Sequence, residues 1–290
     1  MGYWEDRQEQ AYLAAEQKAD AYFKELKASF RQAKREIEYA INDFYTRYAD
    51  VNGVSYQQAQ ILLSKAEIGD LNDYIKKVYA HIGEFDLEVE NMSIKARITR
   101  YQALETQVNA ILNKLYAVDY EQLSGQTLKE IYEEGYFREW FNIDQYKGFH
   151  SNFAGISPEL VDSYVSYPFN GANFSTRLWK QKDYLQAQLM EAMTTMMVTG
   201  AHPSSLAKDF AKKFNAREFD AYRLLHTEAS FMANRAAHDM YKQDDVEKYQ
   251  IIATLDSKTC GICGELDNKV FDVDKAVAGV NMAPFHCFCR

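Results

Sequence analysis

Three cysteines and one histidine near the end of the chain have types and spacing that suit a metal ion. Cys260 and Cys263 form a Cys-x-x-Cys pair, and His286 and Cys289 follow after a long loop. A Cys-x-x-Cys turn lets two thiolates converge about 2.3 Å from a shared ion, and His-x-x-Cys supplies two further ligands of a tetrahedral site. We therefore predict a structural Zn²⁺ site formed by these four side chains.

Two other interpretations of the cysteines stay open. The thiols can be unliganded packing residues, or the Cys-x-x-Cys pair can be a redox site. Redox pairs normally lie at a helix N-terminus after a strand, and Gly264 and the turn at Asn268 argue against that setting. Cys287 is a spare thiol that could replace either of the later two ligands. The number of ligands is therefore better determined than their identity.

The elements that must position these ligands form a small lobe, residues 249–290. Residues 249–255 are rich in β-branched side chains, which is typical of a strand. A second short strand is predicted at 270–271, so the two can form a β-hairpin with a zinc-knuckle-like element. The lobe contains little apolar mass, and a bound ion would contribute folding free energy that burial cannot supply.

Long helices are predicted upstream. Residues 3–48 contain neither proline nor glycine, and their apolar side chains recur in steps of three and four. A second long helix is expected over 86–118, and a capping box at Thr127 predicts another over 128–141. We therefore expect a long-helix bundle domain over 1–145, in which the two long helices pack antiparallel.

The amino-acid composition changes after residue 145. Glycine, proline, asparagine and serine become frequent over 146–172, which predicts a loop-rich linker. A third region, 173–290, then ends in the cysteine lobe, so the fold class is mainly α with a small α+β C-terminal lobe. Further helices are expected over 158–164, 176–198, 206–214 and 216–243.

Three ordered stretches carry a family pattern. Residues 173–179 read Asn-Phe-Ser-Thr-Arg-Leu-Trp, and residues 225–228 read Leu-His-Thr-Glu. The cysteine region combines Asp-Ser-Lys-Thr-Cys-Gly-Ile-Cys, Asp-Asn-Lys-Val-Phe and Pro-Phe-His-Cys-Phe-Cys-Arg. Together they resemble the phage minor head proteins of the Mu protein F-like head morphogenesis family. Asn268 stands where that family usually has glycine, and Ala283 replaces a proline, so details of the turn can differ.

The resemblance implies a structural role. It implies a minor head protein inside the phage capsid that binds the portal protein and other head proteins. Such a protein takes part in head morphogenesis and in DNA packaging or delivery. We expect it in the host cytoplasm during assembly and in the virion afterwards. In some relatives an effector domain follows; this sequence stops at Arg290 and contains none, so it is either complete there or truncated.

The composition of the chain restricts the kinds of partner that we expect it to bind. The chain has 290 residues, a formal net charge of −9 and 47% hydrophobic residues. Proteins that bind nucleic acid strongly usually carry a basic excess, so any contact with phage DNA should be weak. No window approaches the ~20 apolar residues that cross a bilayer, and the chain opens on a polar helix rather than a leader. We expect no membrane contact and no small-molecule substrate.

Enzymatic function is the less favoured alternative. A zinc-lobe nucleic-acid-processing enzyme or a DNA-binding module would use the same cysteines, but no phosphate loop or nucleophile elbow appears. Glu228 is expected to make a structural contact with Arg223 or with Thr227, bracing the helical part against the terminal lobe. Glu88 and Glu90 form a Glu-x-Glu, which transferase toxins also use, but they lack the accompanying motifs. We therefore predict that the chain is not an enzyme.

A methionine-rich stretch lies on the helix expected over 176–198. Its members, Met190, Met193, Met196 and Met197, are interpreted as core filling, with an adaptable protein-binding face as the alternative.

Overall fold

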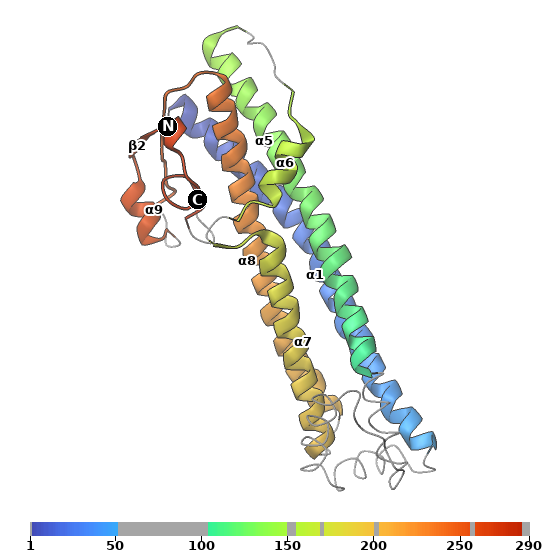
Figure 1. The fold of residues 1–290 in the computed structure, drawn as a ribbon. Helices are drawn as coiled ribbons and strands as arrows, with labels where there is room; N and C mark the ends of the chain where they lie inside the picture. The colour runs from blue at the N-terminus through green and yellow to red at the C-terminus, as the bar shows by residue number, and fades with distance from the viewer. Residues whose placement is uncertain are drawn as a thin grey trace, which may run out of the picture. The chain divides into compact units, whose positions relative to one another are not determined.

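The fold was analysed in a computed structural model, which describes residues 2–51, 104–149, 155–168, 171–199, 203–255 and 259–285. The described chain is mainly helical, with one small two-stranded antiparallel sheet near its end (Figure 1). This confirms the mainly α class and the small α+β lobe that the sequence predicts. The zinc-knuckle part of the prediction stays a prediction.

Two compact units make up the chain. Unit 1 contains residues 1–28, 116–181 and 218–290, and unit 2 contains residues 29–115 and 182–217. Each is built from helices and has its own buried apolar side chains. The division into 1–145, 146–172 and 173–290 stays a prediction.

The first helix, α1, runs over Tyr3–Val51 and confirms the predicted long helix. Its stripe is buried as expected: Ala19, Tyr22 and Leu26 in unit 1, and Phe30, Ile37 and Ile41 in unit 2, are each at most 7% exposed. Glu5 and Asp6 lie in the first turn, where their charges favour the helix dipole.

A second long helical stretch begins within the described residues at 104 and ends at Lys147. It consists of helical residues 104–114, the π-helical segment η1 (Leu115–Gln122) and α5 (Leu123–Lys147). The prediction of separate helices ending at 118 and beginning at 128 was wrong. The Thr127 hydroxyl donates 3.0 Å to the carbonyl of Leu123 one turn back, so Thr127 is inside the helix and caps nothing. The helix ends at Gly148, whose φ of +74° suits a left-handed C-cap.

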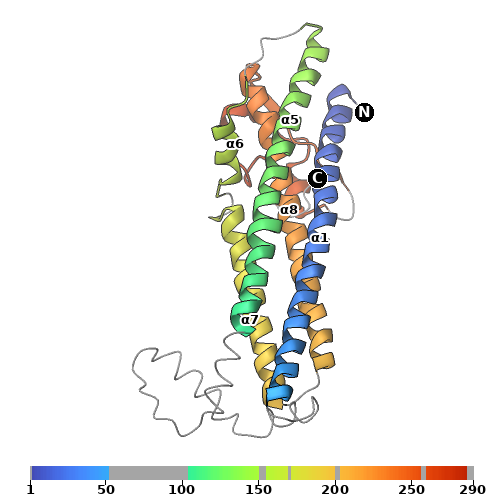
Figure 2. The same ribbon diagram turned by 90° about the vertical axis from the view of Figure 1, so that its right-hand side faces the viewer.

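Within unit 1, α1 and the stretch that includes α5 run antiparallel. The sequence predicted this packing for the helix expected over 86–118, whereas the contacts here are made by residues 119–142. The Tyr3 hydroxyl donates to the Asn142 carbonyl, Gln8 pairs with Glu139, and Tyr22 reaches the carbonyl of Asp119. From one pair to the next the residue number on α1 increases while that of its partner decreases, which is the order of an antiparallel pair. Figure 2 shows α1 and α5 side by side.

Three helices follow. Ser157 caps the short helix α6 (Pro158–Val165), which was predicted over 158–164 and packs against α5. Helix α7 covers Phe174–Thr199, close to its prediction. Helix α8 is a single helix over Pro203–Gln243, whereas two helices divided at Asn215 were expected. Asparagine is only a modestly poor helix former, and Phe214 and Ala221 are buried on the same helix, so packing holds the junction helical.

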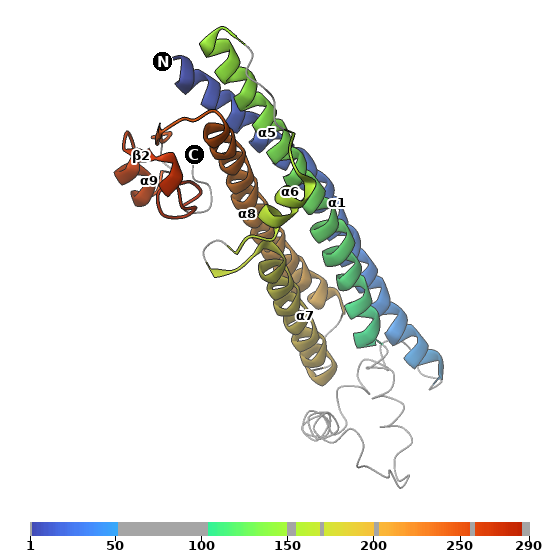
Figure 3. The same ribbon diagram turned by 45° about the horizontal axis from the view of Figure 1, so that its top comes forward.

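The terminal lobe follows α8 in unit 1 (Figure 3). Strand β1 (Lys248–Gln250) pairs antiparallel with β2 (Val270–Asp272), with Tyr249 opposite Phe271. Between them lies the short helix α9 (Gly261–Leu266), and the 3₁₀ turn η3 (Val273–Lys275) follows. The predicted strand 249–255 is thus shorter than expected, while the hairpin pairing is confirmed.

Candidate functional site

The two thiols of the Cys-x-x-Cys pair converge in the lobe. Cys260 is the N-cap of α9, and its Sγ accepts a hydrogen bond of 3.3 Å from the backbone N–H of Cys263. The two Sγ atoms are 3.2 Å apart. Cys263 is 3% exposed and forms a small core with Phe285, against which Ile251 and Leu266 pack. The pair is therefore a fixed feature of the lobe and is held by both backbone and packing.

This geometry fits half of a tetrahedral thiolate site. Two sulfurs bound at about 2.3 Å to one ion at the tetrahedral angle are about 3.8 Å apart, so a small separation of the thiols from 3.2 Å would admit the ion. His286, Cys289 and Cys287 lie outside the described residues. In the part of the chain that the structure does describe, no group of three or more possible ligands is assembled.

The turn after α9 holds an asparagine in a left-handed conformation. Asn268 has a φ of +62°, in the left-handed region that favours glycine. Asparagine tolerates this region better than most residues because its short polar side chain can hydrogen-bond locally. Its backbone N–H donates 2.8 Å to the carbonyl of Ile251, and that of Lys269 donates to Leu266. Asparagine therefore suits the left-handed position at this turn.

A buried ion pair joins the two upstream motifs. Arg177 of α7 and Glu228 of α8 approach to 3.0 Å between Nη1 and Oε1, and the Glu228 side chain is 3% exposed. Burial raises the pKa of Glu228 to about 7, and the Arg177 charge and hydrogen bond oppose this rise. The contact of Glu228 with Arg223 stays a prediction. Thr227 donates to the Arg223 carbonyl.

The same two motifs make further ties within unit 1. The Asn173 side chain caps α7 by accepting 2.8 Å from the N–H of Thr176, and Trp179 Nε1 donates 3.1 Å to Glu121. On α8, His226 lies 3.0 Å from Asp20 of α1. These contacts link α7, η1, α8 and α1. The brace predicted between the helical part and the lobe is thus found between helices instead.

A histidine connects α8 to the lobe. His238 is 4% exposed, and its ring meets that of Tyr249 edge-on at 4.3 Å between centroids. The Tyr249 hydroxyl donates 2.6 Å to the carbonyl of Asn281. Burial, aided by the charges of Arg235 and Lys242, lowers the pKa of His238 to about 4. The imidazole is therefore neutral at pH 7 and acts as a packing group.

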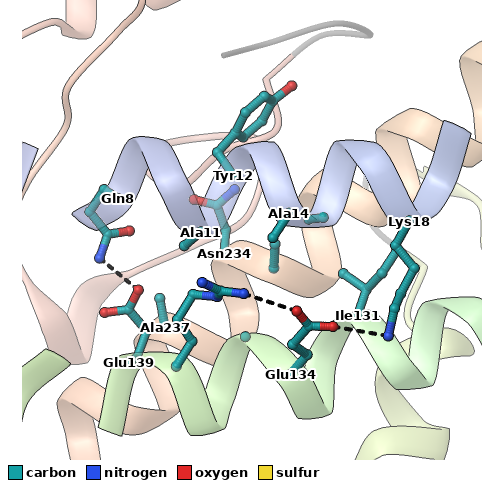
Figure 4. Close-up of a pocket in the computed structure, with 14 residues that line it drawn as sticks. Gln8, Ala11, Tyr12, Ala14, Lys18, Ile131, Glu134, Glu139, Asn234 and Ala237 are labelled. Atoms are coloured by element: carbon teal, nitrogen blue, oxygen red, sulfur yellow. Dashed lines mark hydrogen bonds and ion pairs between the residues drawn. The ribbon is translucent and has the colours of Figure 1, made fainter. Parts of the chain in front are cut away.

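A cavity of about 60 Å³ lies among α1, α5 and α8 and was not predicted (Figure 4). At its base Glu139 is 1% exposed and accepts 2.8 Å from the Gln8 amide. Burial raises the pKa of Glu139 to about 7, against the hydrogen bonds from Gln8 and Asn142 and the charge of Arg138. Glu139 lies one helical turn from Gly135 and from Asn142, and this spacing forms no recognisable sequence motif. The sequence therefore contains no signal for the cavity.

Some of the other residues singled out in the sequence lie outside the described residues. Glu88 and Glu90 are among them. Of the methionines on α7, Met193 is fully buried, which agrees with core filling, while the side chains of Met196 and Met197 are not described. No helix in the described ranges has an apolar stretch long enough to span a membrane.

Comparison with known proteins supports the family resemblance. Residues 187–290 match the family described as phage Mu protein F like protein, which includes α8 and the whole lobe. The motif at 173–179 precedes the matched span. The resemblance predicted from the sequence is confirmed over that range.

One curated protein is similar over a longer stretch. It is the NAD(+)–arginine ADP-ribosyltransferase EFV of Enterococcus faecalis (strain ATCC 700802 / V583), 23% identical over 241 residues. The match covers 81% of this chain and 48% of that protein, so the chain spans about half the length of the relative. No solved structure matches the chain.

Proposed function

We propose, from the premise that residues 187–290 belong to the phage Mu protein F like family, that the chain is a structural protein of a phage head. The family match is the observation that carries this function. The paired motif residues Arg177 and Glu228 support it, because a buried brace between long helices suits a rigid structural part. We further propose that it lies inside the capsid and binds the portal protein.

Co-expression with the portal protein of the same phage tests this placement. We expect the two proteins to co-purify through an affinity tag on the portal and through a subsequent sizing column. A portal carrying the same tag, expressed with an unrelated acidic helical protein, is the control. If both proteins are folded and elute separately, the proposed portal association is wrong.

The proposed Zn²⁺ site would use Cys260, Cys263, His286 and Cys289. The 3.2 Å approach of the first two sulfurs supports it, as does the burial of Phe285, which directly precedes His286, beside Cys263. When bound, the ion would staple the ends of the lobe and add folding free energy. The chain's own residues already orient the thiols through the N–H of Cys263.

Metal analysis of freshly purified, reduced protein is expected to give about one zinc per chain. Cys263→Ser should abolish the bound zinc, whereas Cys287→Ser, which removes the spare thiol, should retain it. Loss of zinc in both variants would show that the ligand set is different. Absence of zinc from the unmodified protein would show that the proposed Zn²⁺ site is wrong.

ADP-ribosyl transfer is a second candidate, favoured only by the relative from Enterococcus faecalis. Because this chain spans 48% of that protein, the named activity can belong to the other half. Incubation with NAD⁺ and an arginine analogue should give no nicotinamide release above buffer. Release that is lost in Glu90→Gln but kept in Glu9→Gln would make the chain a transferase.

Contact with phage DNA is proposed to be weak, in keeping with the net charge of −9. Retention on duplex DNA should be slight at low salt and vanish at moderate salt, because few phosphates are neutralised. DNA cleavage with Mg²⁺ or Zn²⁺ that disappears in Cys260→Ser would instead establish a nucleic-acid-processing enzyme.

A further inference from the structure

The Cys-x-x-Cys pair of the terminal lobe already has the sulfur contact from which a disulfide can form. The Sγ atoms of Cys260 and Cys263 are 3.2 Å apart. A disulfide bond measures about 2.0 Å between its sulfurs, whereas two sulfurs on one Zn²⁺ at the tetrahedral angle lie about 3.8 Å apart. The observed separation lies between these values, so a movement of roughly 1 Å or less leads to either arrangement.

Backbone and packing hold the two thiols in this arrangement. Cys260 directly precedes α9, and its Sγ accepts a hydrogen bond of 3.3 Å from the backbone N–H of Cys263. The N–H of Gly264 donates 3.0 Å to the carbonyl of Cys260. Cys263 packs against Phe285 in the small core of the lobe. Because the sulfurs are already brought together, closing the ring between them costs little further conformational entropy.

The two thiols differ in their access to solvent, and this difference sets the order in which they react. Cys263 is 3% exposed, whereas Cys260 is partly exposed. Between them, Gly261 and Ile262 are both exposed. Beyond the adjacent residues and the backbone of α9, a Cβ atom added at Gly261 or Gly264 would meet no described atom within 4 Å. A small disulfide reagent can therefore reach Cys260, while the core of the lobe covers Cys263.

We propose that Cys260 and Cys263 form a reversible thiol–disulfide site whose oxidant is a small disulfide such as oxidised glutathione. The Cys260 thiolate attacks one sulfur of the glutathione disulfide, forms a mixed disulfide and releases one glutathione thiolate. The Cys263 thiolate then attacks the Cys260 Sγ, closes the protein disulfide and releases the second glutathione thiolate. The two protons of the protein thiols pass to the two glutathione thiolates. The pair is thus oxidised, and one glutathione disulfide is reduced to two thiols.

The disulfide and the proposed Zn²⁺ site exclude each other, because both use the same two sulfurs. This consequence rests on the proposed function, under which the chain is made in the host cytoplasm and later carried outside in the phage head. Cytoplasmic thiols are kept reduced, whereas disulfides persist on particles outside the cell. We therefore expect thiols in the lobe during assembly, and the disulfide wherever zinc is withdrawn under oxidising conditions.

Mass spectrometry of the full, zinc-free chain, treated with oxidised glutathione and then with a thiol-alkylating reagent, tests the proposal. Trypsin releases both thiols in one peptide, Thr259–Lys269, which contains neither Cys287 nor Cys289. We expect this peptide to lose both alkylatable thiols and to regain them after treatment with dithiothreitol. Cys263→Ser should instead leave glutathione bound to Cys260, because the second step is missing. Cys287→Ser is the matched control and should form the disulfide as the unmodified chain does.

Two results would overturn the assignment. One is a zinc-free chain in which both thiols of 259–269 can still be alkylated after the treatment. The other is a disulfide that joins either thiol to Cys287 or Cys289. Repeating the treatment on zinc-loaded chain separates this inference from the proposed Zn²⁺ site. Disulfide formation that zinc slows supports both sites, whereas formation at an unchanged rate supports the thiol–disulfide site and counts against the Zn²⁺ site.

Discussion

Single residues set much of the pH response of this protein. Burial raises the pKa of Glu139 to about 7 from its ordinary value of 4.5. A carboxyl group whose pKa is raised on folding favours the folded state fully only below its unfolded pKa, and that contribution is lost as the pH rises through the folded pKa. The window runs from about pH 4.5 to about pH 7.

Glu139→Gln should therefore be more stable than the unmodified chain at pH 8 and indistinguishable from it at pH 4. The expected gain in unfolding free energy is at most about 3 kcal/mol, since each unit of pKa difference between the folded and unfolded states is worth about 1.4 kcal/mol. Urea unfolding at both values, with Glu130→Gln as control, measures it. A gain of the same size at pH 4 would mean that the change acts through packing and not through charge.

The Arg177–Glu228 pair makes a second residue-scale prediction. Arg177→Met leaves a buried carboxylate without its cation, which typically costs about 3–5 kcal/mol. Because the pKa of Glu228 is already about 7, the carboxyl group can take up a proton, so the loss should be smaller at pH 5.5 than at pH 8. Lys180→Met, an exposed change on the same helix, should cost little at either pH. Equal losses at both pH values for Arg177→Met would contradict the pairing.

At the scale of elements, η1 is the feature with the clearest consequence. A π-helical turn changes which carbonyls have helical partners, and here the Tyr22 hydroxyl reaches the carbonyl of Asp119 at 2.5 Å. Ser124 in turn donates 3.1 Å to the Tyr22 oxygen. Tyr22→Phe should destabilise by about 1–3 kcal/mol because the partly buried Asp119 carbonyl loses its donor. Tyr39→Phe, at a tyrosine that is 71% exposed, should have little effect in the same denaturation experiment.

The elements also show what the sequence could and could not predict. Apolar periodicity located α1, because that signal is local. Periodicity could not distinguish one long α8 from two helices, since Asn215 is a weak breaker that packing overrides. The motifs identified Arg177 and Glu228 separately, but their pairing required the fold. The cavity depends on alanines of α1 and α8 and on Gly135 of α5, and no local pattern encodes it.

For the whole molecule, the proposed zinc site predicts that zinc stabilises the terminal lobe and not the helices. Removal of zinc by a chelator should speed amide hydrogen exchange over 259–285, while α1 and α5 stay protected, because their packing does not involve the lobe's ligands. Cys287→Ser should behave as the unmodified chain does. Exchange that rises uniformly along the chain after chelation would show that the lobe and the helices unfold as one.

The antiparallel pairing of α1 also has a consequence for synthesis on the ribosome. Tyr3 and Gln8 find their partners 139 and 131 residues later, and His226, which meets Asp20, comes later still. The first turns of the nascent chain must therefore remain without these long-range native contacts until residues 139–142 have been translated. During that interval its apolar stripe is available to chaperones or to neighbouring nascent chains, so yield should respond to translation speed more than to the equilibrium stability of the finished protein.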